Sequence, residues 1–267
     1  MNTVGSRLGW AVRDGWTITR RDLTHLANQP WQLVVSLLFP IMMVLMFGYL
    51  LGGAMTVPGG GDYREFLLPG MFGLTMVFGL ERTLIAISTD ASKGVTDRFR
   101  SMPMSGSAVV LGRCAADLLD SVVVLAILAG CGLLMGWDWH RGLDQAALAF
   151  GLLLWLRFAM LWVGIYLGLM LPGPEMVMAA QILVWPFGFL SSTFASPDTM
   201  PGWLGAVVEW NPLSATVSAA RELFGNPGVG GDSWAAANAL PLALAWPLLL
   251  TAIFFPLSVR RYRRLSR

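Results

Sequence analysis

Charged residues are scarce in this sequence. Asp, Glu, Lys and Arg make up 13% of its 267 residues, whereas 55% are hydrophobic and the mean hydropathy is +0.62. Soluble domains carry about 25% charged residues, so this chain has too few charges to cover a water-exposed surface of its size. The net charge of +2 is also too small to favour a nucleic acid as partner. The composition therefore predicts an integral membrane protein.

Cysteine and histidine are rare too, and their scarcity excludes several kinds of site. Cys114 and Cys131 fall on one predicted helix, which places them about 25 Å apart, out of reach of an intrachain disulfide. Only His25 and His140 could join them, and no metal-ligand spacing or nucleophile-base pair occurs. The chain also lacks a G-x-x-x-x-G-K-[ST] phosphate loop. We therefore predict no catalytic, metal or cofactor site in this chain.

Long apolar runs are what the sequence does contain. A helix needs about 20 apolar residues to cross the hydrocarbon core of a bilayer. Six stretches meet this length, at residues 31–51, 66–87, 115–136, 146–171, 176–194 and 238–257. Residues 1–30 instead place their apolar side chains along one helical face and their arginines off it, which is typical of a helix lying in the membrane interface; packing on protein is the alternative. The sequence thus predicts an all-α membrane protein with six transmembrane helices.

The distribution of cations predicts the orientation. With six spans both termini lie on one side, and that side has twelve cations. They are Arg7, Arg13, Arg20, Arg21, Lys93, Arg98, Arg100, Arg260, Arg261, Arg263, Arg264 and Arg267. The other side has three, Arg64, Arg141 and Arg221. Because Lys and Arg accumulate in cytoplasmic loops, both termini and the loop at 88–108 are predicted to be cytoplasmic, in a plasma (inner) membrane.

Six ionisable residues lie within or beside the predicted spans: Glu81, Arg82, Arg113, Asp117, Asp120 and Arg157. Ions inside a membrane are costly, so they face protein or water and find partners. One interpretation is a polar lining of a transport path, or an ion-coupled relay. The other is a set of structural pairs, for example Arg157 with Glu81 or Asp117. The sequence leaves both open.

Residues 195–237 contain two helical pieces too short to cross a membrane. Pro201 suits a helix start, Asn211-Pro212 breaks the helix, and Gly225 is a plausible C-cap for Leu213 to Phe224. We expect half-helices at the outer surface or dipping into the outer leaflet. The candidate residues of this outer cap are Pro201, Trp203, Glu209, Asn211, Pro212, Arg221 and Glu222.

The cytoplasmic loop at 88–108 combines cations, an aromatic residue and a proline, which suits either a docking surface or a solvated loop. Two stretches resemble a known family: "TDASKGVTDRFRSMPMSGSAVVLGR" at 89–113 and "SPDTMPGWLGAVVEWNPLSATVSAARELF" at 196–224. Both are similar to the permease subunits of type-2 ATP-binding-cassette (ABC) exporters, especially their daunorubicin-resistance (DrrB-like) branch. The resemblance extends over nearly the whole chain.

The resemblance implies a division of labour. Two permease subunits, this chain twice or with a similar one, would pair with two copies of an ATPase that binds ATP and Mg²⁺. The loop after the second span would be a coupling helix that docks on the ATPase. The expected contacts are Asp90, Asp97, Arg98, Phe99, Arg100, Met102 and Pro103. The half-helices would cap the outer mouth.

The function expected is ATP-driven export of an amphipathic small molecule, such as an antibiotic, by alternating access within membrane lipid. The same machinery moving a lipid-linked or glycan substrate is an alternative. An ion-coupled secondary carrier is a more remote one, since inverted repeats with broken helices are typical of that class and none is visible.

Overall fold

The computed structural model describes residues 30–52, 57, 60–92, 106–170, 173–228 and 233–265. In these ranges every regular element is a helix. They are α2 (Pro30–Leu45), the π-helical η1 (Met46–Leu51), α3 (Tyr63–Ser92), α5 (Gly106–Leu134), α6 (Leu143–Met170), α7 (Pro174–Phe189), the 3₁₀ turn η2 (Pro197–Thr199), α8 (Gly202–Glu209), α9 (Pro212–Phe224), α10 (Trp234–Ala237) and α11 (Ala239–Leu265). The predicted all-helical class is confirmed for this part of the chain.

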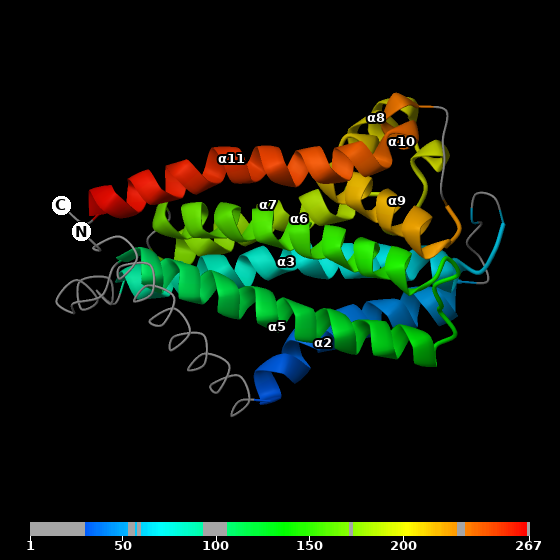
Figure 1. Cartoon of the computed structure of the whole chain (residues 1–267), viewed down its shortest axis with the longest axis horizontal. Coiled ribbons are helices and arrows are strands. Elements are labelled where there is room, and N and C mark those ends of the chain that lie inside the picture. Colours follow the sequence, from blue (N-terminus) through cyan, green and yellow to red (C-terminus); the bar gives the residue numbers. More distant parts are fainter. Residues whose placement is uncertain are drawn as a thin grey trace, which may run out of the picture.

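The long helices form an elongated bundle. Helices α3, α5, α6, α7 and α11 run along its long axis, and the short helices α8 and α10 sit at one end, next to α9 (Figure 1). The C-terminal ends of α3 and α11 lie at the opposite end (Figure 1). The fold therefore separates the outer-cap segment from the end that carries Asp90, Arg260 and Arg261.

Four helical stretches are long and apolar enough to cross a membrane: Tyr63–Asp90, Cys114–Leu134, Leu143–Met170 and Ala239–Tyr262. Two shorter apolar stretches, Leu37–Leu50 and Val177–Phe189, fall within the first and fifth predicted spans. The chain is thus a helical membrane protein. Six complete crossings remain a prediction, because α7 has 16 residues, which rise about 24 Å in a helix.

Helices α3 and α6 form the centre of the bundle. In both helices, 61% of the apolar membrane-crossing stretch is buried inside the protein, whereas in α11 only 22% of this stretch is buried. Glycines on α6 allow the close approach. A Cβ atom at Gly164 would lie 3.0 Å from the carbonyl oxygen of Leu80, and one at Gly168 would lie 2.8 Å from Ile87. Small residues at such contacts are typical of helix packing in membranes.

An aromatic cluster holds the α5–α6 connection against α9. The buried Trp137 ring lies edge-on to Phe72 and Phe224, with centroids 5.1 Å away in both pairs, and the Phe150 ring lies edge-on to Phe224. The Trp137 indole donates a hydrogen bond of 2.9 Å to Asn226 Oδ1. This satisfies the one polar atom of a buried tryptophan and fixes the half-helix segment on the bundle.

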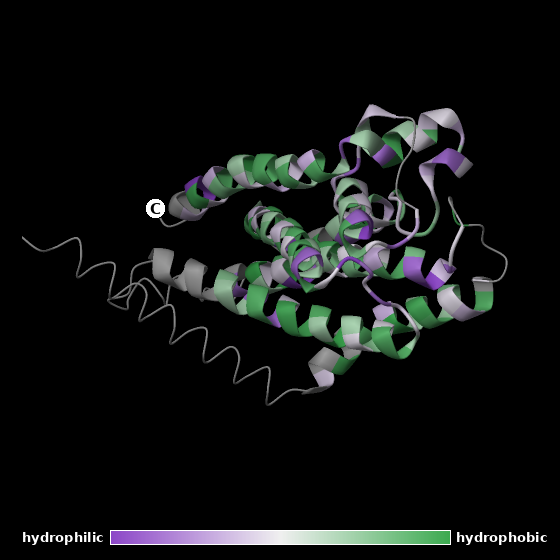
Figure 2. Cartoon of the chain, turned by 45° about the vertical axis from the view of Figure 1, so that its right-hand side comes forward, coloured by the Kyte–Doolittle hydropathy of each residue, from purple (hydrophilic) through white to green (hydrophobic). Residues whose placement is uncertain are grey.

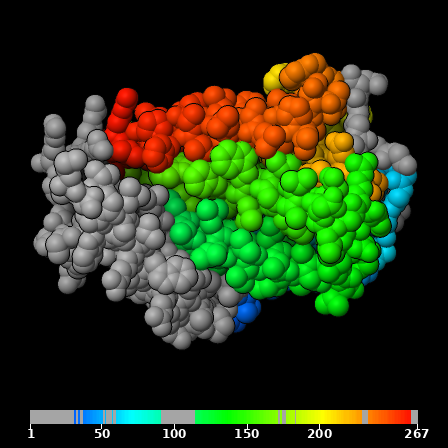
Figure 3. Space-filling model, in the orientation of Figure 1, coloured from blue at the N-terminus to red at the C-terminus, as the bar shows by residue number. Residues whose placement is uncertain are grey.

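Apolar side chains also cover the outside of the bundle. Figure 2 shows hydrophobic residues along the lengths of the helices and hydrophilic ones mainly near the ends. Figure 3 shows a long face formed by α11 together with α5 and α6. On α11, the large apolar side chains of Leu248, Leu249 and Ile253 are all exposed. A surface of this kind suits lipid or another membrane subunit rather than water.

Several predicted boundaries differ from the structure; helix α7, for example, ends at Phe189, whereas the fifth span was predicted to reach residue 194. The predicted loop at 88–108 begins inside α3 and ends inside α5, because α3 continues to Ser92 and α5 starts at Gly106. Helix α11 likewise runs beyond the predicted span end at 257, to Leu265. The interfacial helix predicted for residues 1–30 lies outside the described residues except for its last position.

Candidate functional site

A polar centre joins α3, α5 and α6 inside the bundle. Arg157 of α6 is 1% exposed, and its Nε donates to Ser121 Oγ at 3.0 Å. Its Nη2 donates to Thr83 Oγ1 at 3.0 Å and lies 3.7 Å from Asp117 Oδ2. Thr83 in turn donates to the same Asp117 oxygen at 2.9 Å. The arginine is thus held by one charge and two hydroxyl groups, one from each neighbouring helix.

The side chains of this centre share helix faces because they lie four residues apart in the sequence. Gly79 and Thr83 are four residues apart on α3, as are Asp117 and Ser121 on α5, so each pair occupies one helix face. A Cβ atom at Gly79 would lie 2.8 Å from Arg157 Nε. The glycine therefore leaves the space into which the guanidinium fits. Thr83 and Ser121 were not among the sequence candidates, although their i+4 spacing from Gly79 and Asp117 was visible.

A second ion pair lies beside the first. Arg82 Nη2 is 2.5 Å from Asp120 Oδ2. Asp120 lies three residues after Asp117, so the two carboxylates occupy adjacent positions of one α5 face. The two arginines and two aspartates together carry no net charge. Such a cluster avoids the cost of leaving an ion unpaired in the membrane.

Glu81 does not belong to this cluster. Its Oε2 accepts a hydrogen bond from Gln181 Nε2 of α7 at 3.3 Å. Of the two partners proposed for Arg157, the structure pairs it with Asp117, and the Glu81 alternative is wrong. Consecutive residues of a helix point about 100° apart, which is why Arg82 faces α5 and Glu81 faces α7. Arg113 is in α5, but its side chain is outside the described residues.

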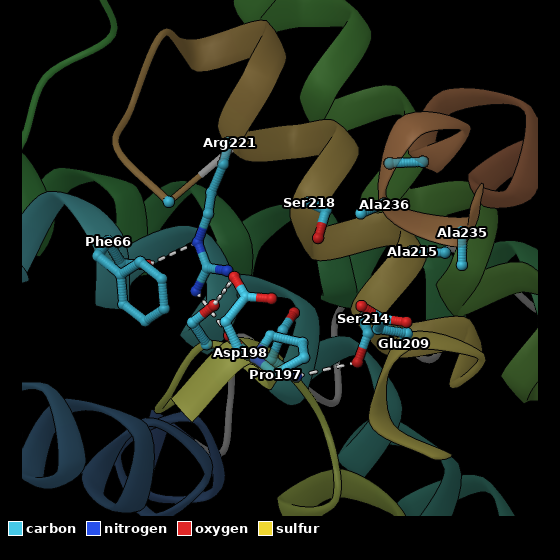
Figure 4. Close-up of a pocket in the computed structure, with 14 residues that line it drawn as sticks. Phe66, Pro197, Asp198, Glu209, Ser214, Ala215, Ser218, Arg221, Ala235 and Ala236 are labelled. Atoms are coloured by element: carbon cyan, nitrogen blue, oxygen red, sulfur yellow. Dashed lines mark hydrogen bonds between the residues drawn. The ribbon is translucent and has the colours of Figure 1, made fainter. Parts of the chain in front are cut away.

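A second candidate site lies under the outer half-helices, and Figure 4 shows it. Arg221 projects from α9 toward Phe66, and its guanidinium carbon lies 3.7 Å from the centre of the Phe66 ring. Nε donates to the Phe66 carbonyl oxygen and Nη2 to that of Ser192, both at 2.9 Å. Burial lowers the pKa of Arg221 to about 9, which leaves it protonated at neutral pH.

A cavity of about 30 Å³ adjoins Arg221, lined in part by Asp198, Glu209 and the hydroxyl-bearing Ser214 and Ser218. This volume accommodates one or two water molecules, whereas drug-sized ligands occupy cavities of about 300 Å³ or more. The cavity is therefore too small for an amphipathic cargo. Arg221 acts here as a buried link that ties α9 to α3 and to the 191–194 turn.

Asn211 provides the second link of the half-helices to the bundle, and this link joins them to α7. Its Oδ1 accepts from the Leu213 N–H, which caps α9, and its Nδ2 donates to the carbonyl oxygens of Phe187 and Leu190. Pro212 occupies the first helical position, one residue before the predicted start at Leu213, and Gly225 ends α9 at φ 77°, as predicted. The break and both ends of this half-helix were visible in the sequence.

The remaining outer-cap candidates lie apart from these links. Pro201 precedes α8 as its N-cap residue. Trp203 is 72% exposed and Glu222 is exposed on α9, so neither contributes to the buried site. Glu209 lines the cavity. Of the seven outer-cap candidates, the structure gives inward-facing positions to Asn211, Pro212, Arg221 and Glu209.

The predicted ATPase contacts fall mostly outside the described residues. Asp90 lies in the last turns of α3. The other six lie between residues 93 and 105, which the structure does not describe: Asp97, Arg98, Phe99, Arg100, Met102 and Pro103. Among the described residues, no three His, Cys, Asp or Glu side chains gather as a metal site would require.

The fold and its polar centre define a class, that of α-helical membrane proteins with ions paired inside the bundle. Within that class, the sequence profile described as "ABC-2 type transporter" matches residues 13–224. The chain belongs to this ABC-2 type transporter family, and the resemblance noted in the sequence is confirmed.

Three curated relatives extend the match over most of the chain. The daunorubicin resistance ABC transporter permease protein DrrB1 of Streptomyces coeruleorubidus is 35% identical over 98% of this chain and 90% of its own length. The putative transport permease ycf38 of Cyanophora paradoxa is 24% identical, over 86% and 78%. A probable doxorubicin resistance ABC transporter permease protein DrrC of Mycobacterium tuberculosis is 22% identical, over 76% and 74%. This chain is accordingly a multi-pass permease of the DrrB-like type.

Proposed function

We propose that the chain is the membrane half of an ATP-driven exporter whose cargo is an amphipathic small molecule. The observation that carries the proposal is the 35% identity to a daunorubicin resistance permease over 98% of the chain. The match covers 98% of the chain and therefore includes the half-helices, which favours the same kind of machine. Lipid-linked or glycan cargo is the other outcome of the test below.

The energy would come from a separate ATPase, since the sequence has no phosphate loop. Two copies of each subunit would assemble, with both termini and the 93–105 segment on the cytoplasmic side. Closure of the ATPase dimer on ATP would move the coupling segments, and the rigid long helices would carry that motion outward. Six crossings follow if α2 with η1 and α7 with the turn after it each complete a span.

The half-helices suit the outer mouth in this scheme. They lie at the end of the bundle opposite the C-terminal ends of α3 and α11 (Figure 1). Arg221 and Asn211 tie them to α3 and α7, so movement of either long helix would be transmitted to the cap. This mechanical link supports a role in opening and closing the exit.

Export and its coupling are tested in one experiment. The permease is expressed with its ATPase partner, and drug resistance of the cells is measured beside ATP turnover of the purified complex with daunorubicin or with lipid. Resistance together with drug-stimulated turnover supports the proposal; turnover stimulated by lipid alone assigns the lipid cargo instead.

A test of the docking role of the cytoplasmic segment requires a variant that still inserts into the membrane. The double substitution Phe99→Ala with Arg98→Ala is expected to leave the amount of protein in the membrane unchanged but to abolish export. Undiminished export would discard the docking role. Leu143→Ala, which changes an exposed residue at the start of α6, is the control and should export normally.

A further inference from the structure

Arg260 and Arg261 lie in the last turns of α11 without a partner of opposite charge. Among the described residues, neither arginine has an acidic side chain within ion-pair distance. The Nε of Arg261 is moreover buried and has no hydrogen-bond acceptor. A guanidinium group has five N–H donors, and those that are withdrawn from water need acceptors. These two side chains therefore lack acceptors that a bound anion could supply.

Packing contacts hold this end of α11 in place. Tyr262 packs against an apolar cluster that includes Trp162 of α6. One turn earlier, Ser258 Oγ donates a hydrogen bond of 3.3 Å to the Trp162 carbonyl oxygen. The helix then continues to Leu265. The two arginines are thus presented by a packed helix rather than by a loose tail.

The face of α11 that carries Arg260 is continuous with an exposed apolar face. Helix α11 runs along one edge of the bundle (Figure 1). Leu249 and Ile253 are 48% and 44% exposed on it. Arg260 is also exposed and comes seven residues after Ile253, which places it two helical turns further along the same face. Figure 2 shows hydrophobic residues along most of α11 and hydrophilic ones near its C-terminal end. One surface therefore passes from apolar to cationic.

The length of α11 places the arginines at the level of the lipid headgroups. Arg260 lies 21 residues after Ala239, the first residue of α11, which corresponds to about 32 Å of helix. The hydrocarbon core of a bilayer is about 30 Å thick. When the start of α11 lies at the outer boundary of this core, Arg260 and Arg261 lie at the inner boundary, where the phosphate groups begin.

The chain itself has few carboxylates to neutralise this end. The predicted cytoplasmic segments hold twelve cations but only five carboxylates, Asp14, Asp22, Asp90, Asp97 and Glu175. None of the five belongs to α11, whereas residues 260–264 contain four arginines. The inner leaflet carries anionic phospholipids, and these attract clusters of Lys and Arg that directly follow a membrane span. The charge and the position of the cluster are therefore complementary to the lipid surface.

We propose that the cytoplasmic end of α11, through Arg260 and Arg261, binds the phosphate group of an anionic phospholipid in the inner leaflet. Guanidinium groups suit this role because they pair with phosphate through two parallel N–H···O bonds. The acyl chains of the same lipid cover Leu249 and Ile253. An acidic surface of the ATPase would satisfy the charges but leave this apolar face uncovered, so the observations favour lipid. The bound lipid is a resident partner of the protein, whatever the cargo is.

The test measures which lipid the full-length permease retains. The chain is reconstituted in nanodiscs with equal amounts of phosphatidylglycerol and phosphatidylcholine that have the same acyl chains. Native mass spectrometry of the released protein gives the ratio of bound phosphatidylglycerol to bound phosphatidylcholine. The native chain is compared with the double variant Arg260→Gln with Arg261→Gln and with the double variant Arg260→Lys with Arg261→Lys. The matched control is Arg64→Gln with Arg141→Gln, which removes two cations from segments at the other end.

The native chain is expected to retain phosphatidylglycerol in excess. The glutamine variant should lower the ratio about fivefold or more, because one cation near an anionic membrane surface contributes a factor of about five. The lysine variant keeps the charges but loses the two-bond pairing, so its loss should be smaller. The control changes the net charge of the chain by the same amount and should leave the ratio unchanged.

Four results would each overturn the proposal. A native ratio of one, or an unchanged ratio in the glutamine variant, would show that these arginines bind no anionic lipid. An equal loss in the control would assign the preference to net charge alone. Displacement of phosphatidylglycerol by excess inorganic phosphate would show that the site takes a free anion. If the glutamine variant keeps the native ratio but no longer co-purifies with the ATPase, the arginines contact an acidic protein surface instead.

Discussion

At the scale of single residues, the polar centre around Arg157 compensates a positive charge that is buried inside the bundle. The guanidinium is buried among a carboxylate and two hydroxyl groups, and one of its nitrogens, Nη1, has no hydrogen-bond partner. A buried pair of this kind contributes little net stability but makes loss of either partner costly. The centre is therefore sensitive to substitutions that leave one charge behind.

Removing the arginine alone tests this sensitivity. Arg157→Leu leaves Asp117 without its cation and is expected to lower the free energy of unfolding by about 3–5 kcal/mol. The double variant Arg157→Leu with Asp117→Leu should be less destabilised than the single one, because no charge is stranded. Thermal unfolding in detergent, followed by tryptophan fluorescence, measures both. A single variant as stable as the native chain would mean that Arg157 reaches water.

Gly79 is predicted to be required for the same centre. Gly79→Ala places a methyl group 2.8 Å from Arg157 Nε and must displace the guanidinium from Ser121 and Thr83. We expect a loss of about 1–3 kcal/mol, as for other overpacked cores. Gly151→Ala on α6 is the control, since its added methyl group meets no atom within 4 Å. Equal melting temperatures of the two variants would argue against the displacement.

At the scale of elements, the half-helix α9 depends on one side chain at its start. Asn211→Ala removes the cap of α9 and two hydrogen bonds to the carbonyl groups of Phe187 and Leu190, at the end of α7 and just after it. A cap is worth about 1 kcal/mol and the two stranded carbonyl groups add to that, so we expect a loss of about 2 kcal/mol or more. Ser233→Ala, which removes only the cap of the four-residue α10, should cost less. Chemical unfolding in detergent measures the loss of unfolding free energy in each variant and shows which loss is larger.

Helix positions followed from sequence more readily than helix ends. Each of the six apolar runs overlaps a helix of the structure, and the break at Asn211-Pro212 was signalled by proline. The end of α11 was missed because hydropathy falls at Arg260 whereas the helix continues on cationic residues to Leu265. Helix α7 was predicted too long, since residues 190–194, three of which carry hydroxyl groups, form a turn that is hydrogen-bonded to Ser214 of α9.

The candidate site was predictable from the sequence only in part. Charges in apolar runs stand out, so Arg157 and Asp117 were found, but which residues meet depends on how three helices rotate about their axes. That rotation separates Glu81 from Arg157 and pairs it with Gln181. Uncharged partners such as Thr83 and Ser121 carry no signal of their own in an apolar helix. Arg221 was assigned to the cap, but its burial against Phe66 needed the fold.

At the scale of the whole molecule, the predicted topology rests on the cations counted along the sequence, twelve on the side of the termini and three on the other. Arg260 and Arg261 lie at one end, and Arg64, Arg141 and Arg221 belong to segments at the other (Figure 1). The positive-inside rule predicts which end is cytoplasmic. In a chain with Cys114 and Cys131 replaced by alanine, Asp144→Cys should react with a membrane-impermeant maleimide in intact cells. Arg260→Cys should react only in inside-out vesicles; the reverse pattern would invert the topology.

The central claim is that this permease moves cargo only when a separate ATPase drives it. The most direct measurement is uptake of a fluorescent amphiphile into proteoliposomes that contain either the purified permease alone or the permease with its co-purified ATPase. We predict accumulation against the gradient only when both subunits and hydrolysable ATP are present. Equal uphill accumulation by the permease alone would contradict the account.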